Sequence, residues 1–196
     1  MKKRLLLTTS LICIGLSAQA QLRFGVMGGF QSSQLHASAS GVRLSTSGLL
    51  GIHIGGVVEY AVNEKLYIQP GLMLSFKGGN YRDGFDAYKT SLTYLEVPVQ
   101  AIYKHEIGSG KLVGGIGPYF GFLMGGTDDD EPIAVGKEVK GFDAGLKLSG
   151  GYELTEKKLL LNLFYNAGLA NINPSSLIKL KNSTVGLSIT YFFGGQ

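Results

Sequence analysis

Residues 49–77, LLGIHIGGVVEYAVNEKLYIQPGLMLSFK, decide the fold of this chain. Large apolar side chains occupy even positions from Leu50 to Tyr60, and mostly small or polar residues lie between them. After a short polar break at residues 63–65, the alternation resumes as far as Phe76. Alternation with period two is typical of β-strands, and a short break between two such runs predicts a hairpin. Each strand has about ten or more residues, close to what a tilted strand needs to cross a bilayer.

The rest of the chain repeats this hairpin. Alternating patterns predict six further strands, at residues 22–31, 92–103, 111–124, 141–153, 158–170 and 183–193. Polar or glycine-rich segments predict long connections at residues 32–48, 78–91, 125–140 and 171–182. The other connections are short turns, so long and short connections alternate as they do in outer-membrane barrels. We therefore predict an all-β fold, an eight-stranded antiparallel up-and-down transmembrane β-barrel, in the bacterial outer membrane.

The two faces of the predicted strands differ in composition. One face carries large apolar side chains, and the other carries mostly Gly, Ser, Thr, Asn and Gln. A secreted soluble barrel of the lipocalin type has similar strands, but its apolar face points inward around a ligand. Its water-facing surface should be rich in Lys, Glu and Asp, whereas small polar residues suit a cramped interior. We therefore expect the apolar face to contact lipid, with the lipocalin-like barrel as the alternative.

The first 20 residues predict a cleaved secretory signal peptide. A basic start precedes an apolar run and an Ala-x-Ala end, with cleavage expected after Ala20, so that residues 21–196 form the barrel domain. The only cysteine, Cys13, leaves with the signal, which excludes disulfides and cysteine-based metal sites. Three of the eighteen Lys and Arg residues also leave, and fifteen then face fourteen Asp and Glu residues. This near-neutral balance argues against a nucleic-acid partner.

The face with small side chains also carries charged residues and one histidine, which we expect in the barrel interior. This expected interior polar network comprises Arg23, His53, Glu59, Lys77, Glu96, Lys111, Asp143, Lys147 and Glu153. An eight-stranded barrel is only wide enough for its side chains to fill, so the network predicts a plug of ion pairs with no open channel. A narrow pore is the alternative, if some of these pairs switch.

Two short motifs raise other chemistry. The acidic run at residues 128–131 offers hard oxygen ligands for a divalent cation, but its spacing matches no calcium loop, and we interpret it as a solvated loop tip. His36 and Ser38 have the His-x-Ser spacing of outer-membrane lipid A deacylases, in which a base and a nucleophile share a strand face. No carboxylate is obviously placed to orient His36. We therefore expect no enzymatic activity, no metal and no cofactor, with a lipid-acting enzyme as the competing hypothesis.

Several segments resemble the PorT-like outer-membrane β-barrel family of Bacteroidota. They are YLEVP at residues 94–98, GGIGPY at 114–119, FDAGL at 142–146, GGY at 150–152 and YNAGLANI at 165–172. The resemblance implies an eight-stranded outer-membrane barrel in a family most of whose members have no assigned biochemical activity. Its namesake is associated with protein secretion across the outer membrane. We expect three partners: outer-membrane lipid, the barrel-assembly machinery during biogenesis, and a protein bound by the extracellular loops.

Overall fold

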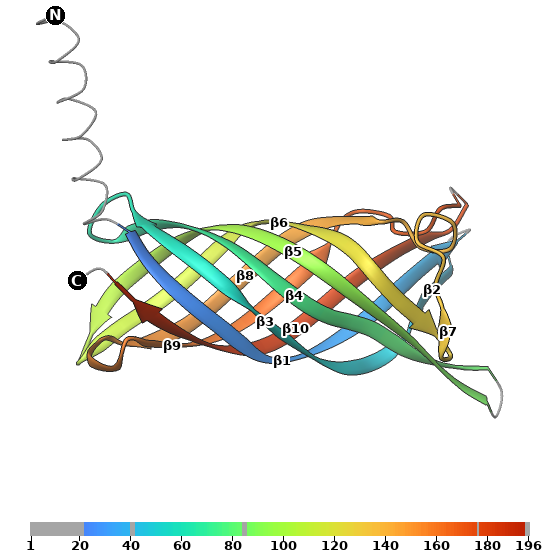
Figure 1. Ribbon diagram of the computed structural model, residues 1–196, viewed down its shortest axis with the longest axis horizontal. Helices are drawn as coiled ribbons and strands as arrows, with labels where there is room; N and C mark the ends of the chain where they lie inside the picture. Colours follow the sequence, from blue (N-terminus) through green and yellow to red (C-terminus); the bar gives the residue numbers. More distant parts are fainter. Residues whose placement is uncertain (1–21, 40–41, 84–85, 176, 195–196) are drawn as a thin grey trace, which may run out of the picture.

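Figure 1 shows the computed structural model, which describes residues 22–39, 42–83, 86–175 and 177–194. The predicted signal peptide lies outside the described residues. The elements are β1 (Leu22–Ala39), β2 (Val42–Ser45), β3 (Ser47–Ala61), β4 (Leu66–Asp83), β5 (Asp86–Ile107), β6 (Gly110–Asp128), β7 (Glu131–Pro132), β8 (Phe142–Leu154), the 3₁₀ turn η1 (Thr155–Lys157), β9 (Leu159–Gly168) and β10 (Lys179–Phe193). Among the described residues, no helix is long and apolar enough to cross a membrane.

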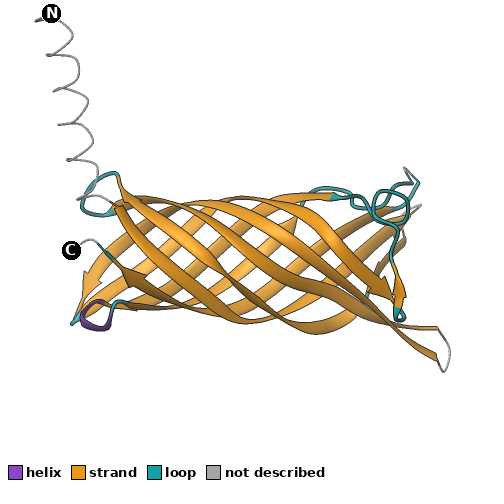
Figure 2. Ribbon diagram, in the orientation of Figure 1, coloured by secondary structure: helices purple, strands orange, loops and turns teal. Residues whose placement is uncertain are grey.

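Eight long strands form a closed ring. Around it the order is β1, β3, β4, β5, β6, β8, β9 and β10, and β10 pairs with β1 to close the ring. Every neighbouring pair in the ring is antiparallel. The short strand β2 pairs with the end of β1, and β7 pairs with the end of β6. Figure 2 shows the resulting barrel of tilted strands, which confirms the predicted all-β up-and-down fold.

The outer wall of the barrel carries the large apolar side chains. Leu50, Phe30 and Leu187 are 83%, 73% and 64% exposed, whereas their neighbours Gln31 and Ser188 are each 3% exposed and point inward. Successive side chains of a strand point to opposite faces, so one face of each strand looks outward around the whole ring. An apolar outer wall suits lipid. The lipocalin-like alternative requires the reverse arrangement and is wrong.

The strands are longer than the alternation predicts at one end of the barrel. That end holds β2 and β7, whereas the start of β1 and the end of β10 lie at the other, with the short turns (Figure 1). The predicted loops at residues 32–48 and 78–91 are largely wrong, because β1 continues to Ala39 and the β4–β5 pairing continues to Asp83 and Asp86. The segments 125–140 and 171–182 also lose residues to β6 and β10. The apolar pattern stops where lipid stops, but backbone N–H and C=O groups still need partners, so the ladder continues.

Glycines on the inner face let strands approach closely, and Gly117 on β6 shows this most clearly. A Cβ atom there would collide with the carbonyl oxygen of Val99 and lie 2.7 Å from Cα of Gln100, whereas a Cβ at Gly114 would meet nothing within 4 Å. We expect Gly117→Ala to lower the free energy of unfolding by about 3 kcal/mol, and Gly114→Ala to change it by less than about 0.5 kcal/mol. The chain has no tryptophan, so heat-modifiable gel mobility across a urea series is the suitable measurement. Equal losses in the two variants would contradict this account.

Candidate functional site

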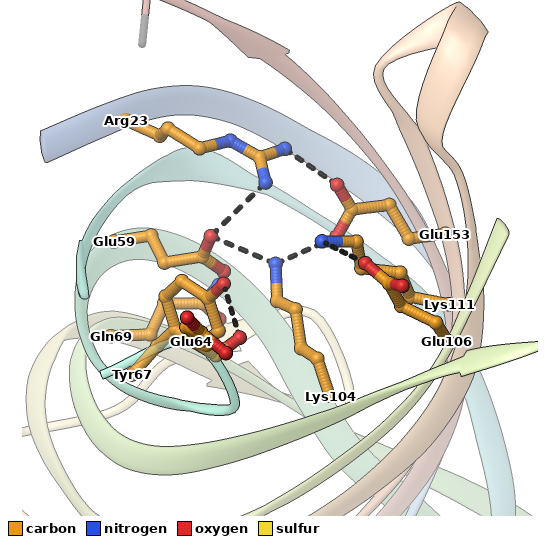
Figure 3. Close-up of polar contacts among 9 residues, drawn as sticks. All are labelled: Arg23, Glu59, Glu64, Tyr67, Gln69, Lys104, Glu106, Lys111 and Glu153. Atoms are coloured by element: carbon orange, nitrogen blue, oxygen red, sulfur yellow. Dashed lines mark hydrogen bonds and ion pairs between the residues drawn. The ribbon is translucent and has the colours of Figure 1, made fainter. Parts of the chain in front are cut away.

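A four-membered ring of charges crosses the lumen (Figure 3). It lies near the end of the barrel where β1 starts and β10 ends. Arg23 on β1 contacts Glu59 at 3.3 Å and Glu153 at 2.7 Å, and Lys104 on β5 contacts the same carboxylates at 2.8 and 2.6 Å. Gln69 adds a hydrogen bond to Glu59 at 3.3 Å. Cations and anions alternate around the ring, so each charged group has two neighbours of the opposite sign. Glu59 on β3 is directly opposite Arg23 on the neighbouring strand, whereas the other three ion pairs join strands that are not neighbours in the ring and so reach across the lumen.

Lys104 belongs to this ring, although the sequence analysis omitted it from the interior network. The predicted strand ended at Tyr103, whereas β5 continues to Ile107. A signal was present, because Glu96, Gln100 and Lys104 recur on one face of the strand. A longer strand would have placed Lys104 inside.

Lys111 was expected in the same network but lies at its edge. Its ammonium is 3.5 Å from Glu106, and the two side chains are 23% and 83% exposed. Figure 3 shows this pair beside the charge ring. Lys111 therefore belongs to the rim of the barrel, since β6 begins at Gly110 and its first inward position is still open to water.

An apolar layer fills the lumen next to the charge ring, which the expectation of small polar interior residues did not foresee. Its members come from seven different strands: Met27, Val57, Met73, Ile102, Val113, Leu160 and Phe192. All are at most 9% exposed. The ring of Phe192 touches both regions, because the Arg23 guanidinium lies 4.2 Å and the Lys104 ammonium 5.3 Å from its centroid. This packed apolar layer excludes water and ions from this section of the lumen.

A second polar cluster lies nearer the other end and surrounds Lys77. Its ammonium forms an ion pair with Glu96, lies 3.9 Å from Asp143, and faces the rings of Tyr94 and Tyr119 at 5.5 and 4.8 Å. Tyr119 also donates a hydrogen bond to Asp143 at 3.2 Å. All five residues are at most 1% exposed. The structure thus brings three of the predicted residues, Lys77, Glu96 and Asp143, into one cage.

The last two predicted residues, His53 and Lys147, lie in the lumen but outside both charge clusters. Nε2 of His53 is 2.8 Å from the hydroxyl of Ser188, and its ring packs edge-on against Phe164. The Lys147 ammonium lies 4.1 Å from the centroid of Phe164. No ion pair within 4 Å links Lys147 to another residue in the part of the chain that the structure describes. Phe164 therefore supplies the nearest favourable contact for this cation.

A second apolar cluster covers the Lys77 cage at the end of the barrel that holds β2 and β7. It consists of Leu35, Leu92, Tyr94, Leu123, Val139 and Ile172. Val139 and Ile172 come from connections between strands, and the Lys140 amide donates to the Ile172 carbonyl at 2.7 Å. Two of the segments predicted as free loops, 125–140 and 171–182, therefore turn part of their length into the barrel mouth.

The two other candidate motifs, His36-x-Ser38 and the acidic run at residues 128–131, make contacts that belong to the fold. Nδ1 of His36 lies 2.7 Å from the hydroxyl of Ser45 on β2. In the acidic run, Asp128 accepts a hydrogen bond from Thr90 at 2.6 Å, and Asp129 and Asp130 form the left-handed turn into β7. Across the described residues, no group of three or more His, Cys, Asp or Glu residues is placed to hold a metal ion.

The comparison with protein families agrees with this geometry. The model of the outer membrane protein beta-barrel domain matches residues 17–173. The chain belongs to this family. The outer membrane protein beta-barrel domain places the chain in the bacterial outer membrane, with its apolar wall in lipid. No curated protein sequence matches the chain.

Three solved structures are similar to this member of the outer membrane protein beta-barrel family. The attachment invasion locus protein Ail of Yersinia pestis is 14% identical, with a TM-score of 0.47, covering 88% of this chain and 99% of that one. Neisserial surface protein A is 14% identical, with a TM-score of 0.48, covering 87% and 97%. The N-terminal barrel domain of Pseudomonas aeruginosa OprF is 15% identical, with a TM-score of 0.36, covering 85% and 97%.

Proposed function

We propose that this protein is a non-enzymatic, non-conducting outer-membrane barrel that binds its partner through the end that holds β2 and β7. The observation that carries this proposal is the succession of layers in the lumen. The charge ring, the apolar layer, the Lys77 cage and the second apolar cluster follow one another along the barrel. Apart from Arg23, whose side chain is 19% exposed, the members of these layers are buried, so an ion would have to displace packed side chains to pass.

The extracellular end supplies the surface for a partner. The short turns, the start of β1 and the end of β10 mark the periplasmic end, so the strand extensions and β2 and β7 project outward. The β4–β5 hairpin reaches furthest along its own ladder, and the rings of Tyr81 and Tyr88 stack on it at 5.1 Å. We propose that a protein partner binds this end, since tyrosine side chains are enriched among the residues that dominate binding at interfaces.

Planar-bilayer recording tests the closed lumen. We expect the folded wild-type protein to produce no current steps above the lipid baseline across a range of voltages. A shift in gel mobility on boiling, measured on the same sample, establishes that the inserted protein is folded. Reproducible unitary steps from folded protein would refute the proposal and favour a narrow pore.

The non-enzymatic part of the proposal rests on His36. Its Nδ1 atom contacts Ser45, and the described residues place no carboxylate in hydrogen-bond contact with its ring. A serine nucleophile needs a base that is itself oriented. Replacing Ser38 by Ala should leave lipid A acylation unchanged; a changed profile would revive the lipid-acting enzyme.

We also propose that the chain is one of the PorT-like barrels of Bacteroidota and that residues 1–20 are its cleaved signal. The motifs that carry this resemblance supply all four residues around Lys77, namely Tyr94, Glu96, Tyr119 and Asp143. Among related barrels, replacement of Lys77 should coincide with replacement of its carboxylate partners; independent variation would count against the grouping. The first described strand begins at Leu22, the second residue after the expected cleavage site, and N-terminal sequencing of the mature protein tests that site.

A further inference from the structure

An open pocket of about 470 Å³ lies on the outer wall of the barrel at its extracellular end. It is formed by the ends of β1, β2, β9 and β10. Its polar lining comprises chiefly His36, Ser45, Tyr165, Lys179, Lys181 and Ser183. The lining contains two lysines, a histidine and several hydroxyl groups, and it contains no carboxylate. The lining of the pocket therefore carries net positive charge.

The strand register brings the basic groups of the pocket together. His36 on β1 is directly opposite Lys181 on β10 and Ser45 on β2, and Ser38 is opposite Lys179. Side chains opposite one another on the same face of a sheet have Cβ atoms about 5 Å apart. Lys179 and Lys181 are two residues apart and share one face. No carboxylate in the described part of the chain lies within 4 Å of either lysine, so both ammonium groups are available to a ligand.

The position of the pocket along the barrel indicates that its ligand is a lipid. On β10 the outward side chains are aliphatic at Leu187 and Val185, which are 64% and 47% exposed, and the next outward positions are Ser183 and Lys181. Lys181 lies about 13 Å along the strand from Val185, and less than that in height because the strand is tilted. The hydroxyl of Tyr165 accepts a hydrogen bond from Ser183 at 3.1 Å, and tyrosines of this kind mark the level of lipid headgroups. The pocket therefore begins where the hydrocarbon ends.

We propose that this pocket binds the phosphate-bearing headgroup of a lipid in the outer leaflet. Lys179 and Lys181 contact the phosphate, and the ring of His36 and the hydroxyls of Ser45 and Ser183 supply hydrogen bonds around it. The apolar wall below holds the acyl chains of the same lipid. Lysine ammonium groups bind phosphate as compact charges, without the fixed geometry that arginine demands. This site does not depend on the closed lumen, so either proposal can fail alone.

Native mass spectrometry of the full-length folded protein in detergent tests the site, with lipid A as the added lipid. The probes are lipid A with both phosphates, lipid A with its phosphates removed, and inorganic phosphate. The variant Lys179→Gln/Lys181→Gln removes both charges. The matched control, Lys137→Gln/Lys140→Gln, removes two exposed lysine charges from the same end of the barrel, outside the pocket lining.

We expect wild type and control to retain phosphorylated lipid A equally, and the pocket variant to bind it about tenfold or more weakly. Removal of the phosphates from the lipid should weaken binding to wild type by a similar factor. An equal loss in the control and the pocket variant would overturn the proposal in favour of general electrostatic attraction. Unaltered binding in the pocket variant would also overturn it. If inorganic phosphate binds as tightly as the phosphorylated lipid, the ligand of the pocket is a free anion and the proposal of a lipid ligand is overturned.

Discussion

Lys104→Met is expected to lower the free energy of unfolding by about 3–5 kcal/mol. Lys104 is 2% exposed and lies between Glu59 and Glu153 at 2.8 and 2.6 Å. Without it, two buried carboxylates share the single guanidinium of Arg23, and an uncompensated buried charge is far more costly than the net value of the pair it leaves. Urea unfolding in lipid vesicles, followed by heat-modifiable gel mobility, measures the loss.

Lys111→Met is the matched control for this prediction. It removes the same charge near the same end of the barrel, but the partner of Lys111 is the 83% exposed Glu106, so we expect a loss below about 1 kcal/mol. Adding Glu59→Gln to Lys104→Met should recover part of the stability, because one cation then faces one full carboxylate. Similar losses for Lys104→Met and Lys111→Met would show that the charge ring is open to water.

Phe192→Ala should destabilise the barrel by a comparable amount, about 3–5 kcal/mol. Phe192 is 0% exposed and packs in the apolar layer, with the Arg23 guanidinium against its ring. Truncation leaves a cavity that neighbouring strands cannot collapse to fill, because the barrel wall is tied by its ladder. It also removes the ring contact of a charged group. The same urea series measures this effect.

The neighbouring residue supplies the control. Phe193 points to the outer wall, is 46% exposed, and stacks with Phe24 at 6.4 Å. Phe193→Ala loses apolar contact with lipid but leaves no enclosed cavity, so we expect about 1–2 kcal/mol. If Phe193→Ala were the more damaging of the two, the barrel would depend on its lipid contacts more than on its filled interior.

Within the eight predicted strands, the facing of the side chains was determined by the sequence alone, and so was the number of strands in the ring. Leu187 points out and Ser188 points in because the alternation of side chains along a strand is a local property of the backbone. The same rule predicts that Glu59, Glu96 and Glu153 face inward, and each of these residues is 1% exposed. Eight such runs with alternating long and short connections then predict an outer-membrane barrel.

The tertiary structure decided which inward residues meet. Arg23 and Glu153 are 130 residues apart, and only closure of the ring brings them to 2.7 Å. The apolar layer likewise takes one side chain from each of seven strands, and no single strand carries a sequence pattern that predicts the layer. The strand ends beyond the membrane could not be predicted from the sequence either, because strand pairing there depends on backbone hydrogen bonds and no longer on an apolar face. Alternation is encoded residue by residue, whereas height in a barrel depends on the tilt and register of every strand at once.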